Sequence, residues 1–179
     1  MIGQATPFGT LGTMSQYVAI DSQILNAVEA RMIEFGKTFQ PIVQVKVRRD
    51  SDMNPRFTPG PDTPPVIIIT MNDDKRIEEA TGLDVFVNHD VTVEWMQTEQ
   101  PQERGEDAKL RLILERIRRT LHVVRIGDIR DIKGKRVMSD AFVRDDKPYS
   151  LPFKDQKVNV SPQVFTYQTM ETRNNTPGV

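Results

Sequence analysis

The residues best suited to acid–base or metal chemistry are two histidines, His89 and His122, in a chain of 179 residues without cysteine. The lack of cysteine excludes a disulfide, a thiolate metal site and a thiol nucleophile. Neither histidine has a second histidine or a cluster of carboxylates at the spacing of metal ligands. His89 lies on the apolar side of a strand pattern, and His122 ends an arginine-rich helical pattern. We therefore expect packed or capping histidines, with no metal and no cofactor.

Motifs for phosphate binding and hydrolysis are also missing from the sequence. It contains no glycine-rich phosphate loop, no G-x-S-x-G elbow and no H-E-x-x-H. Two pairs of adjacent acids, Asp73-Asp74 and Asp145-Asp146, point apart on an extended chain and predict turns. We expect a protein that is not an enzyme. A small enzyme that combines Asp or Glu with one of the two histidines is the catalytic alternative.

A cluster of arginines is the main candidate for binding. Its members lie on and just after a helix predicted over residues 106–121: Arg111, Arg116, Arg118, Arg119 and Arg125. One interpretation places them near DNA phosphates, which guanidinium groups bind without sequence preference. A second is a solvated helix face, whose cations near the C-terminal end suit the helix dipole. A third is pairing between subunits with an acidic stretch: Asp73, Asp74, Glu78 and Glu79.

The charges of the chain are unevenly distributed although its net charge is only −1. Residues 42–105 carry 7 basic and 12 acidic side chains, whereas residues 106–136 carry 10 basic and 5 acidic ones. The first window has a net charge of −5 and the second +5. Such a chain could attract copies of itself, present a basic face to a polyanion, or simply carry solvated charge.

The elements that must position these residues follow from hydrophobic periodicity. Apolar residues at helical spacing predict a first helix that is capped at Asp21 or Ser22 and ends at Gly36. The second helix, over residues 106–121, carries a continuous apolar stripe from Leu110 to Leu121. Alternating or continuous apolar residues predict strands over 42–48, 66–71, 85–96 and 164–171. The strand over 66–71 is apolar on both faces, which predicts a central position.

These elements predict an α+β fold with one domain. We expect a mixed or antiparallel sheet of about four to five strands, covered by two helices. The domain spans residues 20–172, with an extended N-terminal arm over 1–19 and a tail over 173–179. Within it, residues 49–65 predict a proline-rich loop and residues 123–160 an irregular insertion. No stretch of 18 apolar residues occurs, so we expect no contact with a membrane.

The order of elements resembles that of the tail terminator proteins of long-tailed bacteriophages, the lambda-type minor tail proteins. The resemblance covers about residues 20–172 and rests on patterns: the strand at Pro65-Val66-Ile67-Ile68-Ile69, the long strand through residues 89–95, the polar link at 100–105, the helix over 107–121 and the closing strand over 163–172. The chain departs from the family in the length of residues 123–160 and in its N-terminal arm.

The resemblance implies a structural virion protein. By this resemblance, such a protein forms a hexameric ring at the head-proximal end of the tail. It ends polymerisation of the tail tube and joins the tail to the head or neck. The implied partners are further copies of this chain, the tail tube protein, head–tail connector proteins and DNA passing through the lumen. The particle is assembled in the host cytoplasm. A neck or head-completion ring and a non-specific DNA-binding module are the alternatives.

Overall fold

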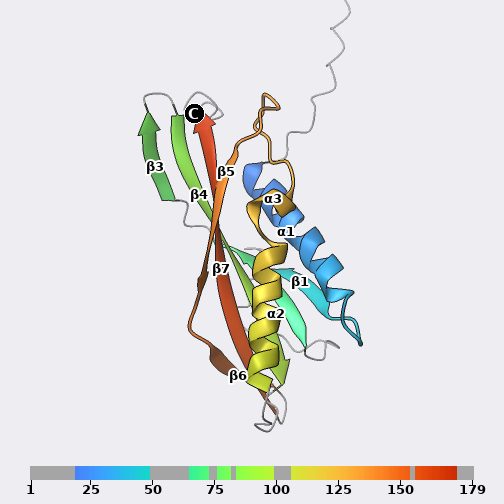
Figure 1. Cartoon of the computed structure of the whole chain (residues 1–179). Coiled ribbons are helices and arrows are strands. Elements are labelled where there is room, and N and C mark those ends of the chain that lie inside the picture. Colours follow the sequence, from blue (N-terminus) through green and yellow to red (C-terminus); the bar gives the residue numbers. More distant parts are fainter. Residues whose placement is uncertain are drawn as a thin grey trace, which may run out of the picture.

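The computed structural model describes residues 19–48, 65–72, 76–81, 84–98, 106–153 and 156–172. Three predicted segments lie outside this part of the chain: the arm over 1–19 except Ala19, the loop over 49–65 except Pro65, and the tail over 173–179. The described residues form an α+β fold, as predicted, in which helices cover one face of a mixed sheet (Figure 1). None of the described helices is long and apolar enough to cross a membrane.

The sheet contains seven strands in the described residues, more than the four to five predicted. In chain order they are β1 (Gln44–Arg48), β2 (Val66–Met71), β3 (Arg76–Thr81), β4 (Asp84–Thr98), β5 (Met138–Asp145), β6 (Tyr149–Phe153) and β7 (Gln156–Thr172). The main path is β1-β2-β4-β7-β5, while β3 pairs with β4 and β6 with β7. Only β1 and β2 are parallel. The prediction that residues 66–71 form a central strand is confirmed, because β2 lies between β1 and β4.

The two longest strands, β4 and β7, form the spine of the sheet. They pair antiparallel over the whole length of β4, from Asp84 opposite Thr172 to Thr98 opposite Val158. Each outer edge of this ribbon carries two shorter strands, one toward each end: β3 and β2 along β4, and β5 and β6 along β7. The spine thus connects both ends of the molecule, and Figure 1 shows how strongly it twists.

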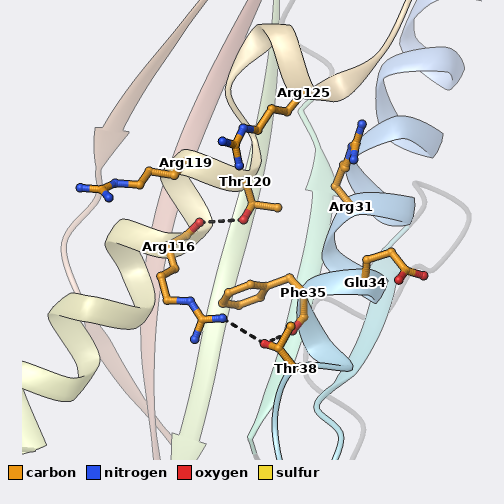
Figure 2. Close-up of a pocket in the computed structure, with 8 residues that line it drawn as sticks. All are labelled: Arg31, Glu34, Phe35, Thr38, Arg116, Arg119, Thr120 and Arg125. Carbon is orange, nitrogen blue, oxygen red and sulfur yellow. Dashed lines mark hydrogen bonds between the residues drawn. The ribbon is translucent and has the colours of Figure 1, made fainter.

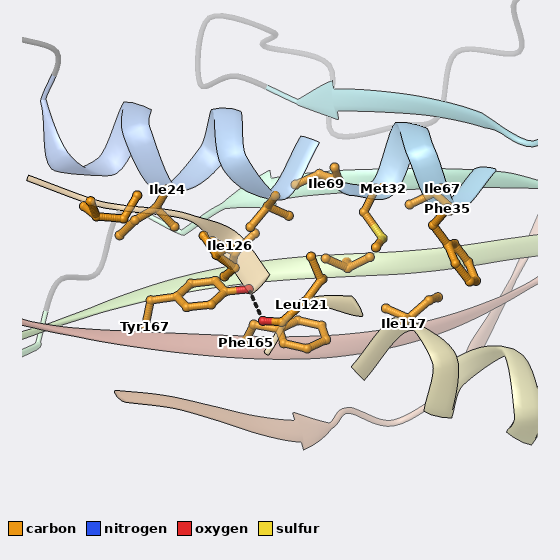
Figure 3. Packing of buried hydrophobic residues seen from close by; sticks show 14 of the residues in the cluster. Ile24, Met32, Phe35, Ile67, Ile69, Ile117, Leu121, Ile126, Phe165 and Tyr167 are labelled. Carbon is orange, nitrogen blue, oxygen red and sulfur yellow. Dashed lines mark hydrogen bonds between the residues drawn. The ribbon is translucent and has the colours of Figure 1, made fainter. Parts of the chain in front are cut away.

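Three helices are described: α1 (Ile20–Gly36), α2 (Glu106–Thr120) and the single turn α3 (Val123–Ile126). The two long helices were predicted from the sequence, and α3 was not. Buried residues of α1 recur at Ile20, Ile24, Val28, Met32 and Phe35, so one side of this helix faces the core. Figure 3 shows these side chains meeting those of α2, the residues after it and the strands beneath.

The core between helices and sheet depends on alternation along the strands. Ile67 and Ile69 of β2, with Phe165 and Tyr167 of β7, point to the helix side and are at most 2% exposed. The Tyr167 hydroxyl donates a hydrogen bond of 3.2 Å to the carbonyl of Leu121, at the end of α2 (Figure 3). A second cluster on the other face contains strand residues only, in the described part of the chain: Val66, Ile68, Met96, Val158, Val160 and Leu151.

Both ends of α1 differ from the prediction. The N-cap is Ala19, which makes no side-chain hydrogen bond, so the prediction of Asp21 or Ser22 as the cap is wrong. Asp21 lies in the first turn, where it contacts His89 of β4. The helix does end at Gly36, but no left-handed residue terminates it, since Lys37 has right-handed dihedral angles. Glycine is required at position 36 because an added Cβ would lie 2.4 Å from the carbonyl oxygen of Val43.

The prediction of irregular structure over residues 123–160 is wrong. This segment contains α3, β5, β6 and the start of β7. Most residues of β5 are exposed, so the strand has no alternating apolar pattern that could reveal it. Gly127 and Gly134 in this segment have positive φ angles of 121° and 76°, a backbone conformation that glycine adopts without strain. Asp145, predicted in a turn, is instead the last residue of β5.

Candidate functional site

A candidate binding site in the described residues is an open, cationic cleft between the helices (Figure 2). Its volume is about 340 Å³. The lining residues come from the end of α1, the end of α2 and α3: Arg31, Glu34, Phe35, Thr38, Arg116, Arg119, Thr120 and Arg125. Four arginines and one glutamate give this cleft a formal charge of +3.

Arg116 of the cleft contacts two aromatic rings and a hydroxyl group. Its guanidinium carbon lies 5.2 Å from the ring centre of Phe35 and 5.7 Å from that of Phe39, at distances typical of cation–π interaction. Its Nη2 atom also donates a hydrogen bond of 3.2 Å to the Thr38 hydroxyl, as Figure 2 shows. The contacts fix one cation in the cleft before any ligand arrives, which lowers the entropy lost on binding.

The other cations of the cleft are less restrained. Arg31 and Arg125 are exposed, and no described residue forms an ion pair with either. Arg119 is 75% exposed and donates a hydrogen bond of 2.9 Å to Glu115, one turn earlier on α2. In Figure 2 its side chain points away from α1, while Arg116 points toward it. The cleft therefore offers several separated guanidinium groups, which suit a ligand with several negative charges.

The structure divides the five arginines that were singled out in the sequence. Arg116, Arg119 and Arg125 line the cleft, whereas Arg111 and Arg118 do not. Arg118 forms an ion pair with Asp145 of β5, and Gln163 donates a further hydrogen bond of 3.0 Å to the same carboxylate. The hydrogen bonds from Arg118 and Gln163 lower the pKa of Asp145 below its ordinary value. Arg118 thus connects α2 to the sheet. Arg111 is exposed on α2.

Arg31 was missed by the sequence analysis, although it completes the cleft. It lies four residues before Phe35 on α1, so the two share one side of the helix. That spacing was visible in the sequence, but nothing local indicates that the C-terminal ends of α1 and α2 meet. The contact between the two helices is a tertiary feature.

The four acidic residues predicted as partners of the arginines belong to the chain segment between β2 and β4. Asp73 and Asp74 are outside the described residues. Glu78 and Glu79 belong to β3, where their backbones pair with Phe86 and Val85 of β4. The structure therefore leaves pairing between copies as a prediction.

His89 occupies a second polar cluster, which is buried between α1 and the sheet. Its Nδ1 atom lies 2.6 Å from Asp21, and its Nε2 atom lies 2.9 Å from the Thr169 hydroxyl and 3.4 Å from Glu171. Burial lowers the pKa of His89, but hydrogen bonds and charges from Asp21 and Glu171 outweigh this effect and raise it above 6.5. The sequence interpretation of His89 as a packed residue is confirmed, since it is 2% exposed.

The order Thr169–His89–Asp21 resembles that of a nucleophile, base and carboxylate. Thr169 is fully buried, however, and its hydroxyl also donates a hydrogen bond of 2.8 Å to Glu171. A nucleophile must contact its substrate, so this arrangement serves better to connect α1 to β4 and β7. His122, the other histidine, is exposed at the residue before α3.

No family model matches this chain, and no curated protein matches its sequence. The described residues contain no group of three or more His, Cys, Asp or Glu side chains arranged to hold a metal ion. The chemistry available at the cleft is therefore that of its guanidinium groups: charge-assisted hydrogen bonding to carboxylates or phosphates.

Proposed function

We propose that this chain is a structural virion protein that forms a ring at the head-proximal end of a phage tail. The ring ends polymerisation of the tail tube and joins the tail to the head or neck. The observation that carries the proposal is the order and pairing of the elements. A helix, a parallel pair of strands, a long strand, a second helix and a closing strand occur in this order, with β3 before the long strand and α3, β5 and β6 before the closing strand. The closing strand β7 pairs with β4 along the full length of β4.

The surface of the fold supports a role in assembly. Large apolar side chains of β5, β6 and β7 are between 37% and 54% exposed: Phe142, Val143, Tyr149 and Met170. Phe142 and Val143 are neighbours on β5, an edge strand of the sheet, so one of them is exposed on each face of this strand. Exposed apolar groups beside an unpaired strand edge are typical of surfaces that contact other proteins. A ring subunit needs such surfaces, because it contacts two neighbours and the structures above and below it.

The proposed partners follow from this role. They are further copies of the chain, the tail tube protein and the head–tail connector or neck proteins, with DNA passing through the lumen. The protein acts in the virion after assembly in the host cytoplasm. It performs its role through contact surfaces, without a cofactor.

Two measurements test the proposal. Light scattering and electron microscopy of the purified chain should reveal a closed ring of fixed size over a range of concentrations. Added to polymerising tail tube protein, this ring should bind tube ends and stop their growth. A chain that stays monomeric at high concentration, and leaves tube length unchanged, would contradict the proposal. A ring that binds connector proteins but not tube ends would favour the alternative of a neck or head-completion ring.

A second candidate function, a non-specific DNA-binding module, is favoured by the cationic cleft alone. It requires the isolated chain to bind duplex DNA with an affinity that falls steeply with salt concentration. Replacement of Arg31 and Arg116 by Gln should then weaken binding equally for all sequences. Absence of retention on DNA at low salt would eliminate this candidate.

A further inference from the structure

Strand β5 has one edge that pairs with β7 and an outer edge that pairs with no strand of the described residues (Figure 1). The N–H of Asp146, one residue after β5, donates a hydrogen bond to Pro162 of β7. The N–H of Ala141 instead donates to the carboxylate of Asp140, the residue before it. Backbone groups of successive residues point to opposite edges of a strand. The N–H and C=O groups of Ala141 and Val143 therefore point outward, away from β7.

Two large apolar side chains are exposed beside this edge. Phe142 is 54% exposed and Val143 is 42% exposed, and the two point to opposite faces of the strand. Asp140 and Arg144 lie two residues before and two residues after Phe142, so they share its face, and both are exposed. Phe142 is thus flanked at equal distances by one acid and one base.

This pattern is complementary to itself when two β5 edges pair antiparallel with Phe142 opposite its own counterpart. Asp140 of each copy then lies opposite Arg144 of the other copy, so the contact contains the same pair of opposite charges twice. Ala141 of each copy lies opposite Val143 of the other, and their outward N–H and C=O groups can form hydrogen bonds. The two Phe142 residues form a non-hydrogen-bonded pair, in which cross-strand side chains are closest.

The neighbouring registers lack this complementarity. A contact centred on Ala141 would place Asp140 opposite Phe142, so the charges would have no partner. A contact centred on Val143 would place Asp140 opposite Asp146, and like charges directly opposite destabilise a strand pair. Charge complementarity therefore favours a second copy of this chain on the β5 edge and selects the register centred on Phe142.

We infer that the β5 edge pairs with the β5 edge of a second copy around a two-fold axis at Phe142, which extends the sheet across two chains. On pairing, the Ala141 N–H exchanges the Asp140 carboxylate for a carbonyl group of the other copy, and this carboxylate meets Arg144. The inference goes beyond the proposed ring and does not depend on it. Contacts around a ring join two different surfaces, whereas this contact uses the same surface on both copies and by itself gives a dimer.

The absence of native cysteine allows a direct test. Phe142→Cys places two thiols opposite each other in a non-hydrogen-bonded pair, where Cα atoms are about 4.5 Å apart, a separation that a disulfide can span. Mild oxidation should therefore convert this variant into a covalent dimer. Val143→Cys is the matched control, because Val143 is the next residue and is also exposed. The two Val143 residues are offset by about 7 Å along the strands in addition to the strand spacing, which is too far for a disulfide.

Charge exchange tests the same contact without a covalent bond. Asp140→Arg alone or Arg144→Asp alone places like charges opposite each other at two positions, so each variant should dimerise at least roughly tenfold more weakly than the wild type. The double variant with both changes restores the two pairs and should recover the dimer. Arg111→Asp is the control for net charge, since Arg111 is exposed on α2. Sedimentation velocity at several concentrations measures the dimer in each case.

The outcomes separate this inference from the proposed function. A covalent dimer from Phe142→Cys but not from Val143→Cys, with recovery in the double charge variant, would support the contact. If the two cysteine variants cross-link at equal rates, or if the double variant self-associates no better than the single ones, the inference is wrong. If rings form but the Phe142→Cys dimer does not, the inference is wrong and the ring proposal remains. If this dimer forms without rings, the inference stands and the ring proposal loses its support.

Discussion

The Nδ1 atom of His89 lies 2.6 Å from the Oδ1 atom of Asp21, and this contact connects the first turn of α1 to the middle of β4. The imidazole is buried, and Glu171 approaches its other nitrogen. An imidazole whose pKa is raised by two carboxylates is therefore part of the packing between the helix layer and the sheet. Its protonation links the stability of the fold to pH.

The first prediction concerns this pH dependence. The folded-state pKa of His89 is raised above 6.5, the value expected in the unfolded chain. The stabilisation that protonated His89 contributes is therefore fully present below a pH of about 6.5, and it is lost as the pH rises through the folded-state pKa of His89. Asp21→Asn removes one carboxylate partner of His89, so the free energy of unfolding at pH 6 should fall by about 1–3 kcal/mol. The decrease of this free energy between pH 6 and pH 9 should also become smaller. Urea unfolding at several pH values measures both effects.

The control for this experiment is the other histidine. His122 is exposed, so His122→Gln should leave the pH dependence of the wild-type protein intact. If Asp21→Asn and His122→Gln give the same pH profile as the wild type, the contact between His89 and Asp21 does not contribute to stability.

The second prediction concerns the ion pair between Arg118 and Asp145. Because the pKa of Asp145 is lowered, the pair stabilises the fold above the unfolded-state pKa of about 3.9, and this contribution is lost as pH falls through the folded-state value. The Asp145 side chain is 57% exposed, so solvent limits the coupling to about 0.2–1 kcal/mol at pH 7. A double-mutant cycle with Arg118→Gln and Asp145→Asn measures this energy. The same cycle at lower pH should give a smaller coupling energy, because Asp145 becomes protonated.

The third prediction concerns Gly36. Alanine usually stabilises a helix relative to glycine by up to about 1 kcal/mol. Here the new Cβ would lie 2.4 Å from the Val43 carbonyl oxygen, so the backbone must move and Gly36→Ala should instead destabilise the protein by about 1–3 kcal/mol. Urea unfolding gives the sign directly. The matched control is Ala30→Gly on the exposed side of α1, which should cost about 1 kcal/mol through propensity alone. If Gly36→Ala stabilises the protein, position 36 does not lie as close to the Val43 carbonyl oxygen as the structure indicates.

The fourth prediction uses the single tryptophan as a probe of the cleft. The ring centres of Trp95, the single tryptophan, and Phe39 are 5.5 Å apart. The guanidinium group of Arg116 lies over the same Phe39 ring. Arg116→Gln removes the cation–π contact with Phe39, so the free energy of unfolding should fall by about 0.5–1 kcal/mol. The fluorescence emission of Trp95 should also change, because Trp95 packs against the same ring. Arg119→Gln is the control, since Arg119 lines the same cleft but contacts no aromatic ring among the described residues. Equal spectra for the two variants would contradict the stacking of Arg116.

The elements with strong periodicity could be predicted from the sequence, and those without it could not. Helix α2 and strand β2 have continuous apolar patterns, and both appear where expected. The edge strands β3 and β5 were missed because edge strands need no regular apolar face. For the candidate site, three of the five arginines named from the sequence, Arg116, Arg119 and Arg125, line one cleft, while Arg118 pairs with Asp145 of β5.

The sequence by itself determined the class of fold, the two long helices, the central strand and the separation of charge along the chain. These properties depend on residue type and on spacing within one segment. Only the tertiary structure decided that Arg31 joins Arg116 across two helices, that Asp21 contacts His89, and that β7 spans β4. Each of these contacts joins residues far apart in the chain. They are set by how the helices pack on the twisted sheet, for which local periodicity carries no information.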